Sequence, residues 1–237
     1  GNIDNSLEKT KAEEKFIESS IIANFPEEKS ASSAPEYKKC AQDYIEMLEK
    51  EKEKRTLENA QYGTVYIGIE ATSYDWRYVA RNEILQIAIV DDAENVLISQ
   101  FCKPVKKKSW ERASSLNSIY PFTVEDCPSF EDIKPYVQDI FNRSKKIVGF
   151  DYYLVRDFLE KYKFDKVPPL VSPVASLRNY NSAVGITNPK WTTLEDAACE
   201  AGAICGDYDA VEDAKGTLAI CNFLKTKKKT ANTAYWH

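Results

Sequence analysis

The stretch Gly63-Thr-Val-Tyr-Ile-Gly-Ile-Glu-Ala-Thr72 decides the fold of this chain. It is rich in β-branched and aromatic residues, and Gly63 is the first glycine after Gly1. Residues of this kind favour extended backbone, so we predict a strand over Thr64–Glu70. Because alternate side chains of a strand point to the same face, Gly68 and Glu70 are expected on one face of the sheet.

Further strands and helices follow this strand in a regular order. Two β-branched segments, Ile84–Asp91 and Val96–Lys103, flank a short polar turn, which predicts an antiparallel hairpin. Three strands followed by helices that alternate with two more strands indicate an α/β domain with a mixed sheet. The other expected elements are helices over Phe130–Asn142, Tyr152–Tyr162, Thr192–Ala203 and Ala210–Leu224, and strands over Lys146–Phe150 and Leu170–Val174.

The chain before Gly63 has a different character. Leu7–Asn24 and Glu36–Asn59 are rich in Glu and Lys, and their apolar residues recur at spacings of three and four. We therefore expect a helical arm over residues 1–60, which packs against the main domain or against a partner protein. The main domain is expected over residues 61–226, followed by a basic tail over residues 227–237.

The inventory of side chains excludes several classes of enzyme. His237 is the only histidine, so Ser-His-Asp and Cys-His catalytic groups and metal sites with two histidines are excluded for this chain. The six cysteines are scattered without a CxxC pair, which is typical of reduced thiols in a cytoplasmic protein. The longest apolar runs are far shorter than a membrane-spanning helix, so no membrane contact is expected.

The charge pattern is mixed. A net charge of −5 does not favour nucleic-acid binding by overall attraction. Local clusters of lysine nevertheless occur, and each is either solvated surface or a contact for phosphate groups. They consist of Lys103 with Lys106, Lys107 and Lys108, of Lys145 with Lys146, and of Lys225 with Lys227 to Lys229.

The order of elements, with an acid at the end of the first strand, resembles the DEDD (DnaQ-like) superfamily of 3′–5′ exonucleases. The chain is most similar to the branch that contains the proofreading subunit of the bacterial replicative polymerase and ribonuclease T. The resemblance covers roughly residues 62 to 226 and implies a ribonuclease-H-like α/β fold: a five-stranded mixed sheet, order 3-2-1-4-5, flanked by helices. Its matching segments are Gly68–Thr72, Ile84–Ala88, Phe101–Pro104, Pro128–Phe130, Gly149–Leu159 and Tyr208–Ala214.

The resemblance also implies a site, and the site is degenerate. In this superfamily four carboxylates hold two divalent cations, and a fifth residue activates the attacking water. Glu70 and Asp213 match two of the four acids, whereas Gly68 and Val155 stand at the positions of the other two, and Tyr208 stands at the position of the general base. We expect at most a single Mg²⁺ or Mn²⁺ ion, bound weakly by Glu70 and Asp213.

Four residues are candidates for binding nucleic acid: Thr72, Trp76, Asp151 and Tyr152. Trp76 lies just after the first strand and Tyr152 opens a helix, where aromatic rings either stack on bases or pack under a loop. Asp151 precedes the same helix, and we favour a helix cap over a metal ligand for it.

Three hypotheses for function follow. The first is a nucleic-acid-binding or nucleotide-binding domain on an exonuclease frame that has lost most of its catalytic activity; its ligand would be a single-stranded 3′ end. The second is an active metal-dependent 3′–5′ exonuclease with a rearranged set of carboxylates that includes Asp151. The third is a protein-interaction module that uses the helical arm over residues 1–60.

Overall fold

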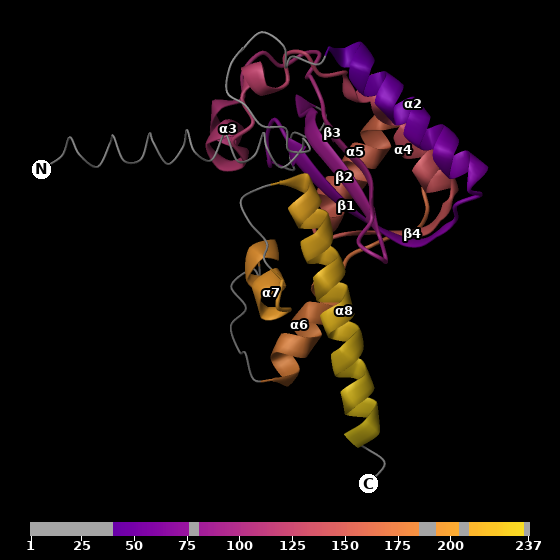
Figure 1. Cartoon of the computed structure of the whole chain (residues 1–237). Helices are drawn as coiled ribbons and strands as arrows, with labels where there is room; N and C mark the ends of the chain where they lie inside the picture. The colour runs from indigo at the N-terminus through magenta and orange to yellow at the C-terminus, as the bar shows by residue number, and fades with distance from the viewer. Residues whose placement is uncertain (1–39, 76–80, 185–192, 204–208, 235–237) are drawn as a thin grey trace, which may run out of the picture. The chain divides into compact units, whose positions relative to one another are not determined.

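The computed structural model describes residues 40–75, 81–184, 193–203 and 209–234 (Figure 1). Five strands form one sheet in the order β3-β2-β1-β4-β5, which confirms the predicted order. β1 pairs antiparallel with β2 and parallel with β4, so the sheet is mixed. The strands are β1 (Tyr62–Ala71), β2 (Ile84–Asp91), β3 (Val96–Phe101), β4 (Ser144–Gly149) and β5 (Leu170–Val171).

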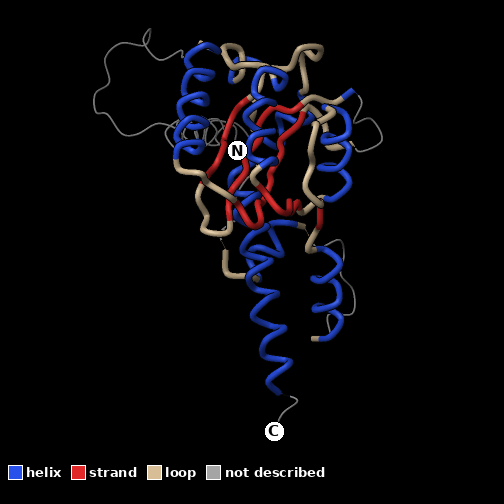
Figure 2. Tube along the Cα trace, turned by 90° about the vertical axis from the view of Figure 1, so that its right-hand side faces the viewer, coloured by secondary structure: helices blue, strands red, loops and turns tan. Residues whose placement is uncertain are grey.

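Helices cover both faces of the sheet, as Figure 2 shows with the strands in red between the blue helices. Val65, Ile67 and Ile69 of β1 point towards α4 (Phe130–Asn142) and α5 (Tyr152–Tyr162) and lie in the main apolar core. Tyr66 of β1 points to the other face, where it packs against Leu218 of α8 (Ala210–Ala234). By this alternation Gly68 and Glu70 also face α8, which confirms the prediction that the two residues share one face of the sheet.

The helices begin where the sequence places capping residues. The side chain of Ser129 accepts a hydrogen bond from the backbone N–H of Asp132, whose carboxylate accepts one from Ser129 in return, a capping box that starts α4. Asp151 caps α5 by accepting a hydrogen bond from the N–H of Leu154 at 3.0 Å. Thr193 caps α7 (Leu194–Glu200) in the same manner. These short-range bonds fix the start of each helix.

The described part of the N-terminal region is α2 (Ala41–Leu57), which packs on α4. Leu48 of α2 is buried in the main core, and Arg55 donates a hydrogen bond to the backbone oxygen of Leu97 at 2.6 Å. Tyr136 of α4 donates to the Glu49 carboxylate at 3.2 Å. The helix expected over Leu7–Asn24 lies outside the described residues.

Several elements differ from the sequence prediction. Helix α3 (Glu111–Asn117) and the 3-10 turn over Pro121–Thr123 lie in a region that we predicted only as loop. The last strand is shorter than predicted, because Pro173 precedes α6 (Val174–Ala183), a helix that the sequence analysis missed. α8 continues past Leu224 to Ala234, through lysines that are compatible with helix. Within the described residues, no helix combines the length and the apolar character that a membrane span requires.

Candidate active site

A small pocket lies at the C-terminal end of β1, where β1, α5, α7 and α8 meet. Its volume is about 170 Å³, and no lysine or arginine is among its described lining residues. The carboxylates of Glu70, Asp213, Glu195 and Asp151 all line it. Gly68 and Val155 line it as well, so the structure brings together five of the residues that the sequence singled out and adds Glu195 to them.

Glu70 is the most deeply buried of these acids, with an exposed fraction of 0%. Tyr74 donates its phenolic hydrogen to one carboxylate oxygen of Glu70, and the side-chain amide of Asn117 donates to the Tyr74 oxygen at 2.8 Å. The other carboxylate oxygen, Oε1, is buried and has no hydrogen-bond partner among the described residues. An oxygen in this state is costly unless it carries a proton or meets a cation.

The electrostatics of the pocket reflect this crowding of acids. Burial, and next the charge of Asp213, raises the pKa of Glu70 to about 9. Burial, and next the charges of Glu195 and Asp209, raises the pKa of Asp213 to about 7. Both shifts have the sign expected for carboxyl groups that lack a neighbouring positive charge.

Gly68 stands at the position where the resemblance drawn from the sequence implies an acid, and the start of α8 packs against it. A β-carbon on residue 68 would lie 2.0 Å from the backbone oxygen of Ala210, in the first turn of α8. Gln86 of β2 holds this turn in position, because its amide donates to the Asp209 carboxylate at 2.9 Å and its carbonyl accepts from the Ala210 N–H at 3.2 Å. An acidic side chain at position 68 therefore has no room while α8 stays where it is.

Val155 occupies the second lost position as part of the apolar core. It is 4% exposed and belongs to the same cluster as Ile67 of β1. A β-carbon on Gly149 would lie 2.8 Å from Val155 Cγ2, so the valine packs directly against the backbone of β4. This side of the pocket is a hydrophobic wall that offers no ligand for a cation.

These residues do not fit a two-metal centre. Within residues 40–75, 81–184, 193–203 and 209–234, no group of three or more His, Cys, Asp and Glu side chains is arranged to hold a metal ion. Asp151 already accepts the capping hydrogen bond of α5. Glu70 and Asp213, with the unpartnered Oε1 of Glu70, fit one hard cation whose other ligands are water.

The remaining candidate residues lie elsewhere. Thr72 is buried and lines a different cavity, and its hydroxyl accepts a hydrogen bond from the N–H of Glu83 at 2.9 Å. Tyr152 lies on a separate groove beside Arg156 and Leu159, so the structure does not bring it to the acidic pocket. Trp76 and Tyr208 lie outside the described residues.

Sequence analysis missed several residues that shape this site. Glu195 gave no signal because its place at the pocket depends on how α7 packs beside α8, as Figure 1 shows. Gln86 resembled an ordinary strand residue, although its pairing with Glu70 across β1 and β2 aims it at α8. The role of Tyr74 also depends on the fold, because its hydroxyl donates to the Glu70 carboxylate.

Comparison with known proteins supports the fold. No model of a known protein family matches the chain, and a search of curated proteins finds no match. Among solved structures, the nuclease domain of 3′hExo, a DEDDh family member, bound to rAMP, has a TM-score of 0.51 at 15% identity over 70% of this chain and 92% of that chain. A 3′-exonuclease with 3′-end specific recognition of a histone mRNA stem-loop has a TM-score of 0.54 at 15% identity, over 72% and 84%.

A third neighbour is the Mg²⁺- and Mn²⁺-bound form of Pop2p from S. pombe, with a TM-score of 0.50 at 11% identity over 80% of this chain and 90% of that chain. The sheet of this chain has the order β3-β2-β1-β4-β5 with helices on both faces, which is the arrangement expected for this fold. The resemblance drawn from the sequence is therefore confirmed at the level of fold, and the chain has the ribonuclease-H-like fold of the DEDD 3′–5′ exonucleases.

Proposed function

We propose that this chain binds the single-stranded 3′ end of a nucleic acid, or a nucleotide, and does not cleave it by two-metal hydrolysis. The fold supports the ligand class, because one structural neighbour is bound to rAMP and another recognises an mRNA 3′ end. The pocket at the end of β1 supports the loss of activity. It retains Glu70 and Asp213 but not the two acids that would complete a two-metal centre.

One observation carries this proposal. The backbone oxygen of Ala210 lies where a side chain at position 68 would begin, so the missing acid reflects a packed contact between β1 and α8. An acid elsewhere in the pocket would not occupy this place. Position 68 carries no acid, and position 208 carries a tyrosine where a general base is expected. Both a ligand for the cation pair and a histidine that could activate water are therefore missing from these positions.

The test uses the full chain with 5′-labelled single-stranded DNA and RNA in Mg²⁺ or Mn²⁺. We expect binding without shortening of the labelled strand. Shortening from the 3′ end that disappears in both Glu70→Gln and Asp213→Asn would overturn the proposal. Shortening that survives in both variants indicates a contaminating nuclease, and a repeat with re-purified protein then decides.

A second candidate is an exonuclease that works with one ion, and Glu195 favours it. Glu195 lines the same pocket as Glu70 and Asp213, at a position where the superfamily pattern gave no ligand. A single Mg²⁺ or Mn²⁺ held there would polarise a phosphate oxygen. Slow trimming that is lost in Glu195→Gln as well as in Asp213→Asn would establish this candidate in place of the first.

A further inference from the structure

A second and larger cavity lies beside the acidic pocket. Its volume is about 820 Å³, within the range typical of ligand sites. Its described wall consists of residues that follow β1, residues that precede β2, and the chain from Lys107 to Leu116 that includes α3. Tyr74 lines both this cavity and the acidic pocket, so the two are neighbours that share one wall.

The two hollows differ in charge. The acidic pocket contains four carboxylates and no described lysine or arginine. The larger cavity is lined by Arg81, Lys107 and Arg112, against the carboxylates of Asp75 and Glu111. A basic surface next to an acidic pocket that fits one cation suits a ligand with several phosphate groups, because each phosphate finds either a cationic side chain or a bound ion.

The segment that carries Lys107 is held rigidly by Glu83. Glu83 is 8% exposed, and its carboxylate accepts hydrogen bonds from the consecutive N–H groups of Val105, Lys106 and Lys107 at 2.7 to 3.2 Å. A carboxylate with three backbone donors fixes the backbone of this segment. The Lys107 side chain therefore starts from a defined point at the cavity and loses less freedom when it meets an anion.

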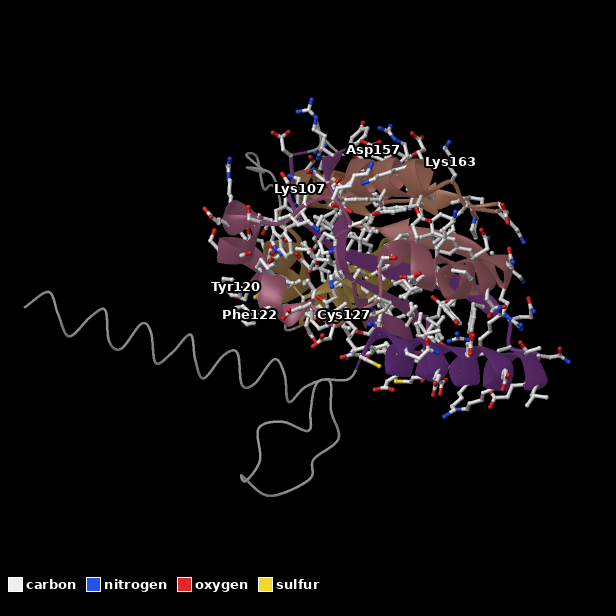
Figure 3. The ribbon with its side chains drawn as sticks, turned by 90° about the horizontal axis from the view of Figure 1, so that it is seen from above. Lys107, Tyr120, Phe122, Cys127, Asp157 and Lys163 are labelled. Atoms are coloured by element: carbon white, nitrogen blue, oxygen red, sulfur yellow. The ribbon has the colours of Figure 1, made fainter. Side chains whose placement is uncertain are left out.

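The part of this segment that carries Arg112 is also fixed. Trp110 is 6% exposed, and its indole N–H donates to the backbone oxygen of Ile119 at 2.7 Å. The hydroxyl of Ser114 donates to the same oxygen at 2.9 Å, which ties α3 to the chain that follows it. Arg112 lies on α3 and is exposed. Seen from above, Lys107 lies in the same half of the domain as Tyr120 and Phe122, away from Lys163 (Figure 3).

We propose that this cavity binds the phosphodiester backbone of a single-stranded nucleic acid, with Lys107 and Arg112 contacting phosphate groups and Glu83 acting as the positioning residue for Lys107. This inference rests on the proposed function, because the strand that passes through the cavity would end in the acidic pocket. Lys107 belongs to a lysine cluster that the sequence left as either solvated surface or a phosphate contact, whereas Arg112 belongs to none of the clusters or motifs of the sequence. The group recognised is the backbone phosphate, so binding is expected to depend little on the identity of the bases.

The test measures fluorescence anisotropy of a labelled single-stranded oligonucleotide with the full chain and with Lys107→Ala, Arg112→Ala and the double variant. The control is Lys50→Ala, which removes the same charge from an exposed residue of α2 that is not among the described lining residues of the cavity. We expect each cavity variant to weaken binding roughly three- to tenfold and to lower the salt slope by about one, and the control to do neither. Lys107→Gln and Arg112→Gln repeat the test where an alanine variant is misfolded by circular dichroism.

Four outcomes separate this inference from the proposed function. Oligonucleotide binding that the cavity variants weaken supports both. If Lys107→Ala, Arg112→Ala and the control variant change oligonucleotide binding to the same extent, the cavity site is overturned and the proposed function still stands. Binding of tripolyphosphate, but not of the oligonucleotide, that requires Lys107 overturns the strand site proposed here and leaves only the nucleotide form of the proposed function. Binding of neither probe to the unaltered chain overturns both.

Discussion

The backbone oxygen of Ala210 lies 2.0 Å from the point where a β-carbon on Gly68 would stand. β1 and the first turn of α8 thus approach so closely that only glycine fits between them. Gln86 holds the contact from the neighbouring strand. This close contact between β1 and α8 leaves no room at position 68 for the side chain of a metal-binding acid.

Restoring that acid should therefore fail. We expect Gly68→Asp to lower the melting temperature by about 5 °C or more, because α8 must shift to admit the side chain, and overpacking typically costs about 1–3 kcal/mol. Nuclease activity should not appear. The matched control is Gly63→Ala, whose β-carbon would meet only the tip of Asp92 at 3.3 Å. A stable Gly68→Asp protein that trims nucleic acid would contradict the packing argument.

Glu70 should make stability depend on pH. Its pKa is raised from 4.5 in the unfolded chain to about 9 in the folded one, so the folded state holds its proton more tightly. As pH rises through this window the unfolded carboxyl ionises first, and the folded protein loses stability. We expect Glu70→Gln to melt higher than the unaltered chain at pH 8, with a difference that shrinks towards pH 5. Parallel melting curves across this range would contradict the assignment, and exposed Glu46→Gln is the control.

The Tyr74 hydroxyl should contribute to folding through two partners. It donates to Glu70 and accepts from Asn117, so Tyr74→Phe takes this donor from the buried Glu70 carboxylate and leaves the Asn117 amide with only its longer hydrogen bond to the Ala71 oxygen. We expect a loss of about 1–3 kcal/mol in the free energy of unfolding, measured by urea titration. Tyr153→Phe, at a ring that is 63% exposed, should change it little. An equal effect of both variants would show that the buried hydroxyl has no special role.

The acidic pocket should bind one divalent cation. A ligand that binds only the folded state raises stability as its concentration exceeds the dissociation constant. We expect millimolar Mn²⁺ to raise the melting temperature of the unaltered chain, and Asp213→Asn to abolish the rise. Isothermal titration gives the number of ions, and two ions per chain would contradict the loss of the second site.

The sequence by itself determined the frame of this protein. Runs of β-branched residues and polar turns gave the strand over Thr64–Glu70 and the hairpin that follows it, and Asp151 was expected to cap the helix that starts after it, because these features act over a few residues. The same local reading placed Gly68 and Glu70 on one face. It also identified Gly68 and Val155 as positions without an acid, since this needs only the identity of the residue.

Only the tertiary structure decided what fills those positions and what surrounds them. The bond between Gln86 and Ala210 joins residues 124 positions apart, and the bond between Glu83 and Lys107 joins residues 24 positions apart. Glu195 reaches the pocket because α7 packs beside α8. Contacts of this kind depend on how whole helices pack against the sheet. The local pattern of residues does not determine how closely a helix such as α8 approaches a strand such as β1.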